Sequence, residues 1–546
     1  MKNRNILALS LGSLMLLNNA YAQKAVVNSQ VAEAMKQASA SQLKADIAYL
    51  ADDKLKGRQP GTEGFKMAAD YVIARLKAHG VQPAGEQGGW LQQVKLRKAF
   101  IAPNAQLTLT KGTAGSILAY GKDFIISPSP AEATGSLNAP LVFAGYGITN
   151  TEQKYDDYAG INVKGKAVLV VRGAPQSFPS SVASHSMDQV VLQKNAVAHG
   201  AVAVIFATVD TTRKLISNLS RPSYSVIDDK GQIAVSGSFY TTQVKLLGTL
   251  SYAVTTQLMK DAGKEVSAVV AALKNGTPQS ADLGYTLKGS YQSTHQDVNS
   301  FNVVGKVSGT DAKLKNEYVV HSAHLDHLGI GRPVEGDSLY NGAHDNASGV
   351  SSLLQIANIY SHVKVKPKRS VLFVAVTGEE LGELGSGYFA IRPTVPVKSI
   401  VADVNTDMPT IISPLLSVTA LGAEHSSLSK VVDEAAAYMD MTVEPDPEPK
   451  ENRFVRSDQY SFVKQGIPAL HIKYGSKTPD GKNNLNELVA VWRAKYYHKP
   501  QDDINGMFDF DAGAKYARLN FLIGYLVANN IARPEWNKGD IFAEKK

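Results

Sequence analysis

The chain has 546 residues, a formal net charge of +8 and no cysteine. With 44% hydrophobic and 19% charged residues, its composition is that of ordinary globular domains, which excludes a disordered, collagenous or coiled-coil chain. The absence of cysteine excludes disulfides, thiolate zinc sites and a cysteine nucleophile, so any metal ion must be held by His, Asp and Glu. Lys and Arg are scattered along the chain, which argues against nucleic-acid binding.

Residues 1–22 are predicted to be a secretory signal peptide. Lys2 and Arg4 precede an apolar run over 6–17, and Ala20-Tyr21-Ala22 fits a small-x-small cleavage site. The apolar run is too short to span a membrane as a helix. We therefore expect cleavage after Ala22, export to the periplasm or secretion, and no membrane span in the mature chain.

The rest of the chain is predicted to contain one α/β domain interrupted by another domain. Apolar residues at helical spacing occur over 41–80, whereas short strand-like runs and glycine-rich turns alternate between about 130 and 285. The predicted boundaries are 23–127 and 289–546 for the two parts of the main domain, and 128–288 for the insert.

The second part of the main domain alternates strands with helices. Such an alternation indicates a mainly parallel sheet packed between helices. A final helix is predicted around Tyr516–Asn529. The earlier elements are strands at 318–323, 370–376 and 400–404 and an amphipathic helix at 348–360.

Acidic and histidine side chains follow the three strands and occupy one adjoining loop. Because ligands of open α/β sheets bind outside the carboxyl ends of the strands, we expect these side chains to converge. They are His324, Asp326 and His327 after the first strand, His344 and Asp345 in the next loop, Glu379 and Glu380 after the second strand, and Asp407 after the third.

Carboxylates packed this closely would repel one another unless cations lay among them. Zinc accepts imidazole and carboxylate ligands. If two zinc ions share Asp345, the carboxylates of Asp345, Glu380 and Asp407 place three negative charges against four positive ones, and one hydroxide completes the balance. This arithmetic favours a two-metal hydrolytic site over a structural zinc, which would need no additional Glu379.

Several segments resemble the zinc aminopeptidases of peptidase family M28, over roughly 40–125 and 295–535. In the family's order, they are His-Leu-Asp-His (324–327), Gly-Ala-His-Asp-Asn-Ala-Ser-Gly (342–349), Thr-Gly-Glu-Glu (377–380), Asn-Thr-Asp-Met (405–408), Arg-Ser-Asp-Gln-Tyr-Ser-Phe (456–462), Gly-Ile-Pro-Ala (466–469) and Tyr-Tyr-His-Lys-Pro (496–500).

The interruption at 130–285 is similar to a protease-associated (PA) domain. This similarity rests on Gly145-Tyr146-Gly147-Ile148, the Tyr155–Tyr158 run and Gly165-Lys166. The two resemblances together imply a mixed, mainly parallel α/β sheet sandwiched by helices, of the zinc exopeptidase type, with an inserted β-rich PA domain.

The M28 resemblance also implies roles for individual residues. Glu379 would be the general base, Asp326 would orient the His324 ring through its other nitrogen, and Tyr497 would donate to the oxyanion. The implied ligands of two Zn²⁺ ions per chain are His324 and Asp407 for one ion, Glu380 and His498 for the other, and Asp345 as the bridge.

Four further polar residues receive no ligand role. We expect His327 and His344 to make local hydrogen bonds, and Ser457 and Asp458 to support the wall of the site.

The implied activity is removal of N-terminal residues from peptides with a free α-amine, through a metal-bridged hydroxide. A carboxypeptidase or dipeptidase on the same scaffold is an alternative, with Arg453 and Arg456 as candidates for binding the substrate carboxylate. A glutaminyl-cyclase-like acyltransferase with one zinc is another, although retention of His324 and Asp407 beside Asp345 argues against it. A non-catalytic binding protein of the same fold should have lost ligands, and this chain retains all five.

Overall fold

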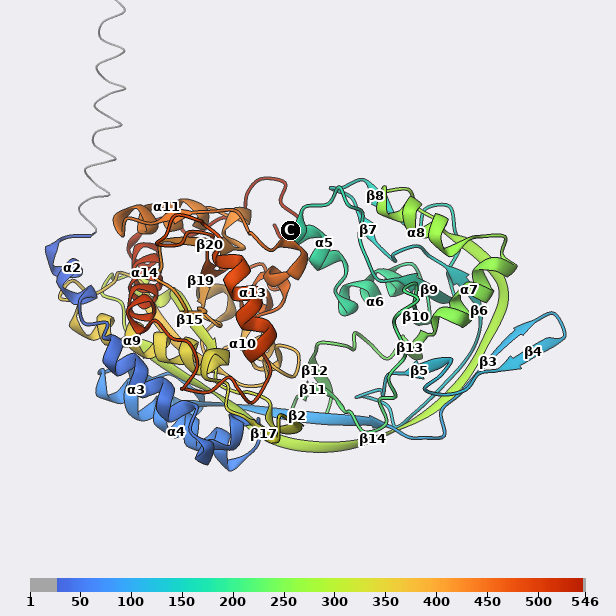
Figure 1. Ribbon diagram of the computed structural model, residues 1–546, viewed down its shortest axis with the longest axis horizontal. Coiled ribbons are helices and arrows are strands. Elements are labelled where there is room, and N and C mark those ends of the chain that lie inside the picture. Colours follow the sequence, from blue (N-terminus) through green and yellow to red (C-terminus); the bar gives the residue numbers. More distant parts are fainter. Residues whose placement is uncertain (1–26, 544–546) are drawn as a thin grey trace, which may run out of the picture.

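The computed structural model describes residues 27–543, which form two lobes joined by long strands (Figure 1). The predicted signal peptide lies outside these residues. Within 27–543, none of the helices combines the length and the apolar character needed to cross a lipid bilayer.

Four parallel strands form the centre of the sheet in the larger lobe. In spatial order they are β18 (Ser370–Val376), β15 (Tyr318–His324), β19 (Ile400–Asn405) and β22 (Ala469–Tyr474). Antiparallel β14 (Ala281–Val307) pairs with β18 at one side, and β20 (Ser417–Leu421) pairs with β22 at the other. The predicted mixed, mainly parallel sheet is confirmed, and the three predicted strands end within one residue of those observed.

Helices cover both faces of this sheet. Val319 and Phe373 belong to the core on one face, whereas their neighbours Val320 and Leu372 belong to the core on the other. Because both faces are covered, nearly every residue of the four parallel strands is buried. The helices of the first face are α2 (Ser29–Met35), α3 (Ala40–Leu50), α4 (Glu63–Ala78), α9 (Ser348–His362), α11 (Leu428–Tyr438) and α14 (Phe510–Asn529), and those of the second face are α10 (Leu384–Ile391) and α12 (Gln459–Val463).

Helix α9 is not amphipathic as predicted. Twelve of its fifteen residues are buried, because α9 packs between the sheet and helices α3 and α14. Its buried hydroxyls donate back into the helix: Ser351 Oγ to the Ala347 carbonyl at 2.7 Å and Ser352 Oγ to the Ser348 carbonyl at 2.9 Å. These bonds allow serines to occupy a buried helix.

The smaller lobe has a hydrophobic core of its own, which draws on residues between Ile101 and Tyr291. Its parallel strands, in order, are β13 (Leu246–Leu250), β10 (Ala203–Ala207), β9 (Ala167–Val171) and β6 (Thr134–Phe143), flanked by antiparallel β5 (Phe124–Ile126) and β14. Its helices are α5 (Ser180–Ser186), α6 (Gln189–Ala198), α7 (Tyr252–Asp261) and α8 (Val266–Lys274).

Two long antiparallel strands join the lobes. Strand β2 (Leu91–Ile101) pairs with the central part of β14, and β14 continues into the smaller lobe, where it pairs with β3 (Gln106–Lys111) and β6 (Figure 1). Strand β14 passes residues 288 and 289 without a break, so the proposed domain boundaries stay predictions. Further strands are β11 (Ser223–Ile227) and β12 (Ile233–Ser236) beside β2, and the hairpin of β16 (Gly329–Val334) and β17 (Asp337–Tyr340).

Candidate metal centre

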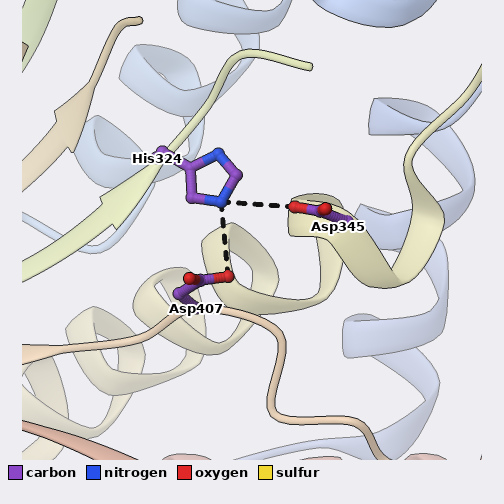
Figure 2. A group of neighbouring side chains, drawn as sticks. All are labelled: His324, Asp345 and Asp407. Atoms are coloured by element: carbon purple, nitrogen blue, oxygen red, sulfur yellow. Dashed lines mark hydrogen bonds and ion pairs between the residues drawn. The ribbon is translucent and has the colours of Figure 1, made fainter. Parts of the chain in front are cut away.

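The carboxyl ends of β15 and β19 and the turn before α9 bring three predicted ligands together. His324 is the last residue of β15, and Asp407 lies two residues beyond the end of β19. Figure 2 shows the His324 ring between the two carboxylates, with Nε2 at 3.3 Å from Asp345 Oδ1 and 3.3 Å from Asp407 Oδ1. Each of the three residues offers a ligand atom within 4.8 Å of the others.

A second group of ligand atoms lies on the other side of Asp345. Asp345 Oδ2 is 3.1 Å from His498 Nε2, which is also 3.2 Å from Glu380 Oε2. His498 follows helix α13 (Leu485–Tyr496), and Glu380 follows β18. Asp345 therefore directs one carboxylate oxygen to each group, the arrangement that a bridging ligand requires. All five predicted ligands meet in one place.

His327 belongs to the second group, although the sequence indicated only local hydrogen bonding for it. Its Nδ1 lies 2.6 Å from Glu380 Oε1, and His327, Asp345 and Glu380 offer ligand atoms within 4.8 Å of one another. The feature of the sequence that could have indicated this position for His327 was the His-x-x-His spacing at the end of β15.

The carboxylates of the centre are buried and close to one another. Burial disfavours the charge of Asp345 and Asp407, but the His324 ring beside both holds each pKa below its usual range. Burial raises the pKa of Glu379 well above its usual range, and the neighbouring carboxylates of Asp407 and Glu380 add to the effect. Such a set of acids and imidazoles fits divalent zinc, whose charge would relieve the repulsion.

Glu379 lies at the edge of the first group. Its Oε2 is 4.0 Å from His324 Nε2, and its side chain is 14% exposed. Among residues 27–543, Glu379 belongs to neither group of potential ligands. Its carboxylate therefore remains available for proton transfer.

Asp326 supports the centre through two different atoms. Its backbone carbonyl accepts a hydrogen bond from His324 Nδ1 at 3.2 Å, which leaves the Nε2 lone pair facing Asp345 and Asp407. Its carboxylate accepts the backbone N–H groups of Glu379 at 3.2 Å and Glu380 at 3.3 Å. The contact with the His324 ring thus comes from the main chain, and the side chain holds the two glutamates.

Three buried residues for which the sequence predicted no role tie the loops of the centre together. Asn346 donates to the Thr406 carbonyl at 3.0 Å and accepts the N–H groups of Gly349 and Met408 at 3.0 Å. Asp502 accepts the N–H groups of His344 at 2.8 Å and Asp345 at 3.0 Å. The third residue is Arg58, whose guanidinium donates to the carbonyls of Leu50, Leu325, Asn341 and Gly342.

The remaining predicted residues lie around the centre. His344 Nε2 donates to the Met507 carbonyl at 2.8 Å and the ring stacks on Phe508, so its contacts are local. Tyr497 stacks on the His498 ring and lines a cavity together with Asp407. Ser457 lines the same cavity, and burial raises the pKa of Asp458 to about 7.

Comparison with family models identifies two segments. Residues 302–520 match Peptidase family M28, and residues 137–243 match the PA domain. The resemblance drawn from the sequence motifs is therefore confirmed for both lobes.

Curated relatives match over shorter stretches. Aminopeptidase Y of Saccharomyces cerevisiae is 29% identical over 175 residues, 30% of either chain. Carboxypeptidase Q of Rattus norvegicus is 31% identical over 121 residues, 21% of this chain and 23% of the relative. The chain thus spans less than a third of the length of these two relatives.

Solved structures also resemble the chain. An aminopeptidase from Aneurinibacillus sp. strain AM-1 is 18% identical with a TM-score of 0.48, covering 92% of this chain and 99% of its own. BSAP, a zinc aminopeptidase from Bacillus subtilis, is 18% identical with a TM-score of 0.42, covering 93% and 98%.

Proposed function

We propose that this chain, which carries a domain of peptidase family M28 in residues 302–520, is an exported di-zinc aminopeptidase that removes N-terminal residues from peptides. The observation that carries the proposal is the position of Asp345, with Oδ1 beside His324 and Oδ2 beside His498. Export to the periplasm or secretion rests on the sequence of residues 1–22 alone.

The proposed ligands are the five residues that the family resemblance implies. His324 and Asp407 would hold one zinc ion, Glu380 and His498 the other, and Asp345 both. When bound, the two ions would polarise the scissile carbonyl and lower the pKa of a coordinated water toward ~7.

Glu379 is proposed as the general base. It would take a proton from the attacking water and pass it to the leaving amine. Its place at the edge of the centre supports this role, because Asp326 fixes its backbone and its carboxylate lies 4.0 Å from His324 Nε2 without belonging to either group of potential ligands. Tyr497 is proposed as a donor to the oxyanion, because it lies beside His498 and lines the adjoining cavity.

A carboxypeptidase or dipeptidase is the second candidate. Arg453 and Arg456 line the cavity beside Asp407, where they would meet a substrate carboxylate. The similarity to Carboxypeptidase Q also favours this second candidate. A one-zinc acyltransferase is less well supported, because two groups of potential ligands share Asp345.

The test is Glu379→Gln assayed on aminoacyl anilides together with zinc content. We expect zinc binding to persist and turnover to fall by at least about 100-fold, because a proton acceptor is lost. Glu383→Gln is the matched control, since the Glu383 side chain is also 14% exposed but lies beside Lys464 at 3.7 Å and not beside His324. Normal turnover by Glu379→Gln would refute the base assignment, and cleavage of N-blocked but not C-blocked dipeptides would favour the second candidate.

A further inference from the structure

A cavity of about 130 Å³ opens beside the metal ligand Asp407. Met408, Val489 and Trp492 give it apolar walls, and Trp492 is almost fully buried. Four of the other lining residues are cations: Arg453, Arg456, Lys473 and Arg493. Within the described range 27–543, the carboxylates that line the cavity are Asp407 and Glu451.

The cations are held around the cavity by fixed contacts. Lys473 Nζ donates to the carbonyls of Asp407 at 3.1 Å and Met408 at 2.7 Å, which places the buried ammonium next to the metal centre. Arg453 pairs with Asp446 and Glu448 behind the cavity wall. A lysine and an arginine, each 7% exposed, are therefore fixed at this wall.

Two further arginines are closer to solvent. Arg493 Nη1 lies 3.5 Å from both Glu448 and Glu451, and Arg456 Nη1 lies 3.8 Å from Glu451. With Asp407 set aside as a proposed zinc ligand, three carboxylates (Asp446, Glu448 and Glu451) stand against the four cations. One additional carboxylate would balance the remaining positive charge.

Hydrogen-bond donors in the wall also lack acceptors. Trp492 Nε1 and Arg453 Nε are buried, and neither has a hydrogen-bond partner within residues 27–543. Both are donors only, and a buried donor without an acceptor is costly. Arg456 and Arg493, which line the cavity and are partly exposed, are donors as well, so a ligand that enters this cavity should carry acceptor oxygens.

We propose that the cavity receives the side-chain carboxylate of an N-terminal Glu or Asp residue, making the enzyme selective for acidic N-termini. This inference rests on the proposed aminopeptidase function. The methylene groups of the side chain would contact Met408, Val489 and Trp492, and the carboxylate would meet the arginines. A bare C-terminal carboxylate would leave the apolar walls uncovered, so the side chain is the better occupant.

The test compares two nearly isosteric substrates, glutamyl and glutaminyl 4-nitroanilide, with leucyl 4-nitroanilide as a third. We expect kcat/KM for the glutamyl substrate to exceed that for the glutaminyl substrate by at least about fivefold, as for one partly exposed ion pair. Arg456→Gln should reduce this ratio toward one, and Arg456→Glu should invert it. The control Arg533→Gln should keep the ratio, because Arg533 has similar exposure (48% against 52%) and pairs with the distant Glu317.

The outcomes separate the two proposals. Cleavage of the leucyl and glutaminyl substrates without a preference for the glutamyl one would overturn the acidic selectivity and leave the aminopeptidase standing. No cleavage of any of the three anilides by the zinc-loaded enzyme would overturn the aminopeptidase itself. Cleavage confined to N-blocked peptides with a free C-terminus, and reduced by Arg456→Gln, would overturn the assignment to an N-terminal side chain.

Discussion

Asp502→Asn tests whether a carboxylate 157 residues from Asp345 in sequence holds this proposed bridging ligand in place. Asp502 is 1% exposed, and its two oxygens accept the backbone N–H groups of His344 at 2.8 Å and Asp345 at 3.0 Å. Asparagine keeps the shape of the side chain but offers one acceptor oxygen instead of two. Its NH₂ group would face one of the two backbone N–H groups.

The expected size of the effect follows from these two bonds. A hydrogen bond to a charged group contributes about 1.5–3 kcal/mol, so loss of one, with a donor now facing a donor, should lower the free energy of unfolding by about 2–4 kcal/mol. Displacement of Asp345 should weaken zinc binding by about 10–100-fold, the usual effect of changing a group that orients a metal ligand.

Zinc affinity is measured by competition with a chelator, and stability by urea denaturation of the zinc-free protein. Asp503→Asn is the matched control, because it makes the same chemical change at the neighbouring residue. There the carboxylate accepts solvent-exposed hydrogen bonds from Asn505. Unchanged zinc affinity in Asp502→Asn, with a folded protein, would refute the claim that Asp502 positions Asp345.

Two further predictions concern other buried groups. Arg58→Met leaves four backbone carbonyls without their donor. We expect the free energy of unfolding, measured by urea denaturation, to fall by about 4 kcal/mol or more. A loss below about 1 kcal/mol would contradict the role of Arg58 in holding these loops together. Burial raises the pKa of Asp157 to about 7 from an ordinary 3.8, so the folded chain holds this proton more tightly. That contribution to stability is present below about pH 4 and is lost as the pH rises through 7. Between pH 4 and 7, the free energy of unfolding should therefore decrease less steeply in Asp157→Asn than in the wild type, by up to about 1.4 kcal/mol per pH unit. Identical pH profiles for the wild type and the variant would contradict the raised pKa of Asp157.

The central strands and the convergence of side chains at their ends could be predicted because the signal is local. Strand β18 is a run of seven buried residues, since helices cover both of its faces, and Glu379 and Glu380 come just after it. The motif segments around His324 and Asp345 added the expected ligand set. Each of these signals lies within a few neighbouring residues.

The supports of the centre could not be predicted because they depend on contacts between distant residues. Asp502 lies 157 residues from Asp345, and Arg58 lies 267 residues from Leu325, whose carbonyl it binds. Nothing beside Arg58 in the sequence distinguishes it from a surface arginine. Helix α9 was predicted as amphipathic, whereas twelve of its fifteen residues are buried and its serine hydroxyls are satisfied by the helix backbone.

The most direct test of the proposed centre is the zinc content of the purified protein and of Asp345→Ala, determined by mass spectrometry after removal of loosely bound metal. We predict two zinc ions per chain in the wild type and at most one in Asp345→Ala, with loss of aminopeptidase activity. A wild-type protein with one zinc ion or none, or an Asp345→Ala variant that still holds two, would contradict a paired centre bridged by Asp345.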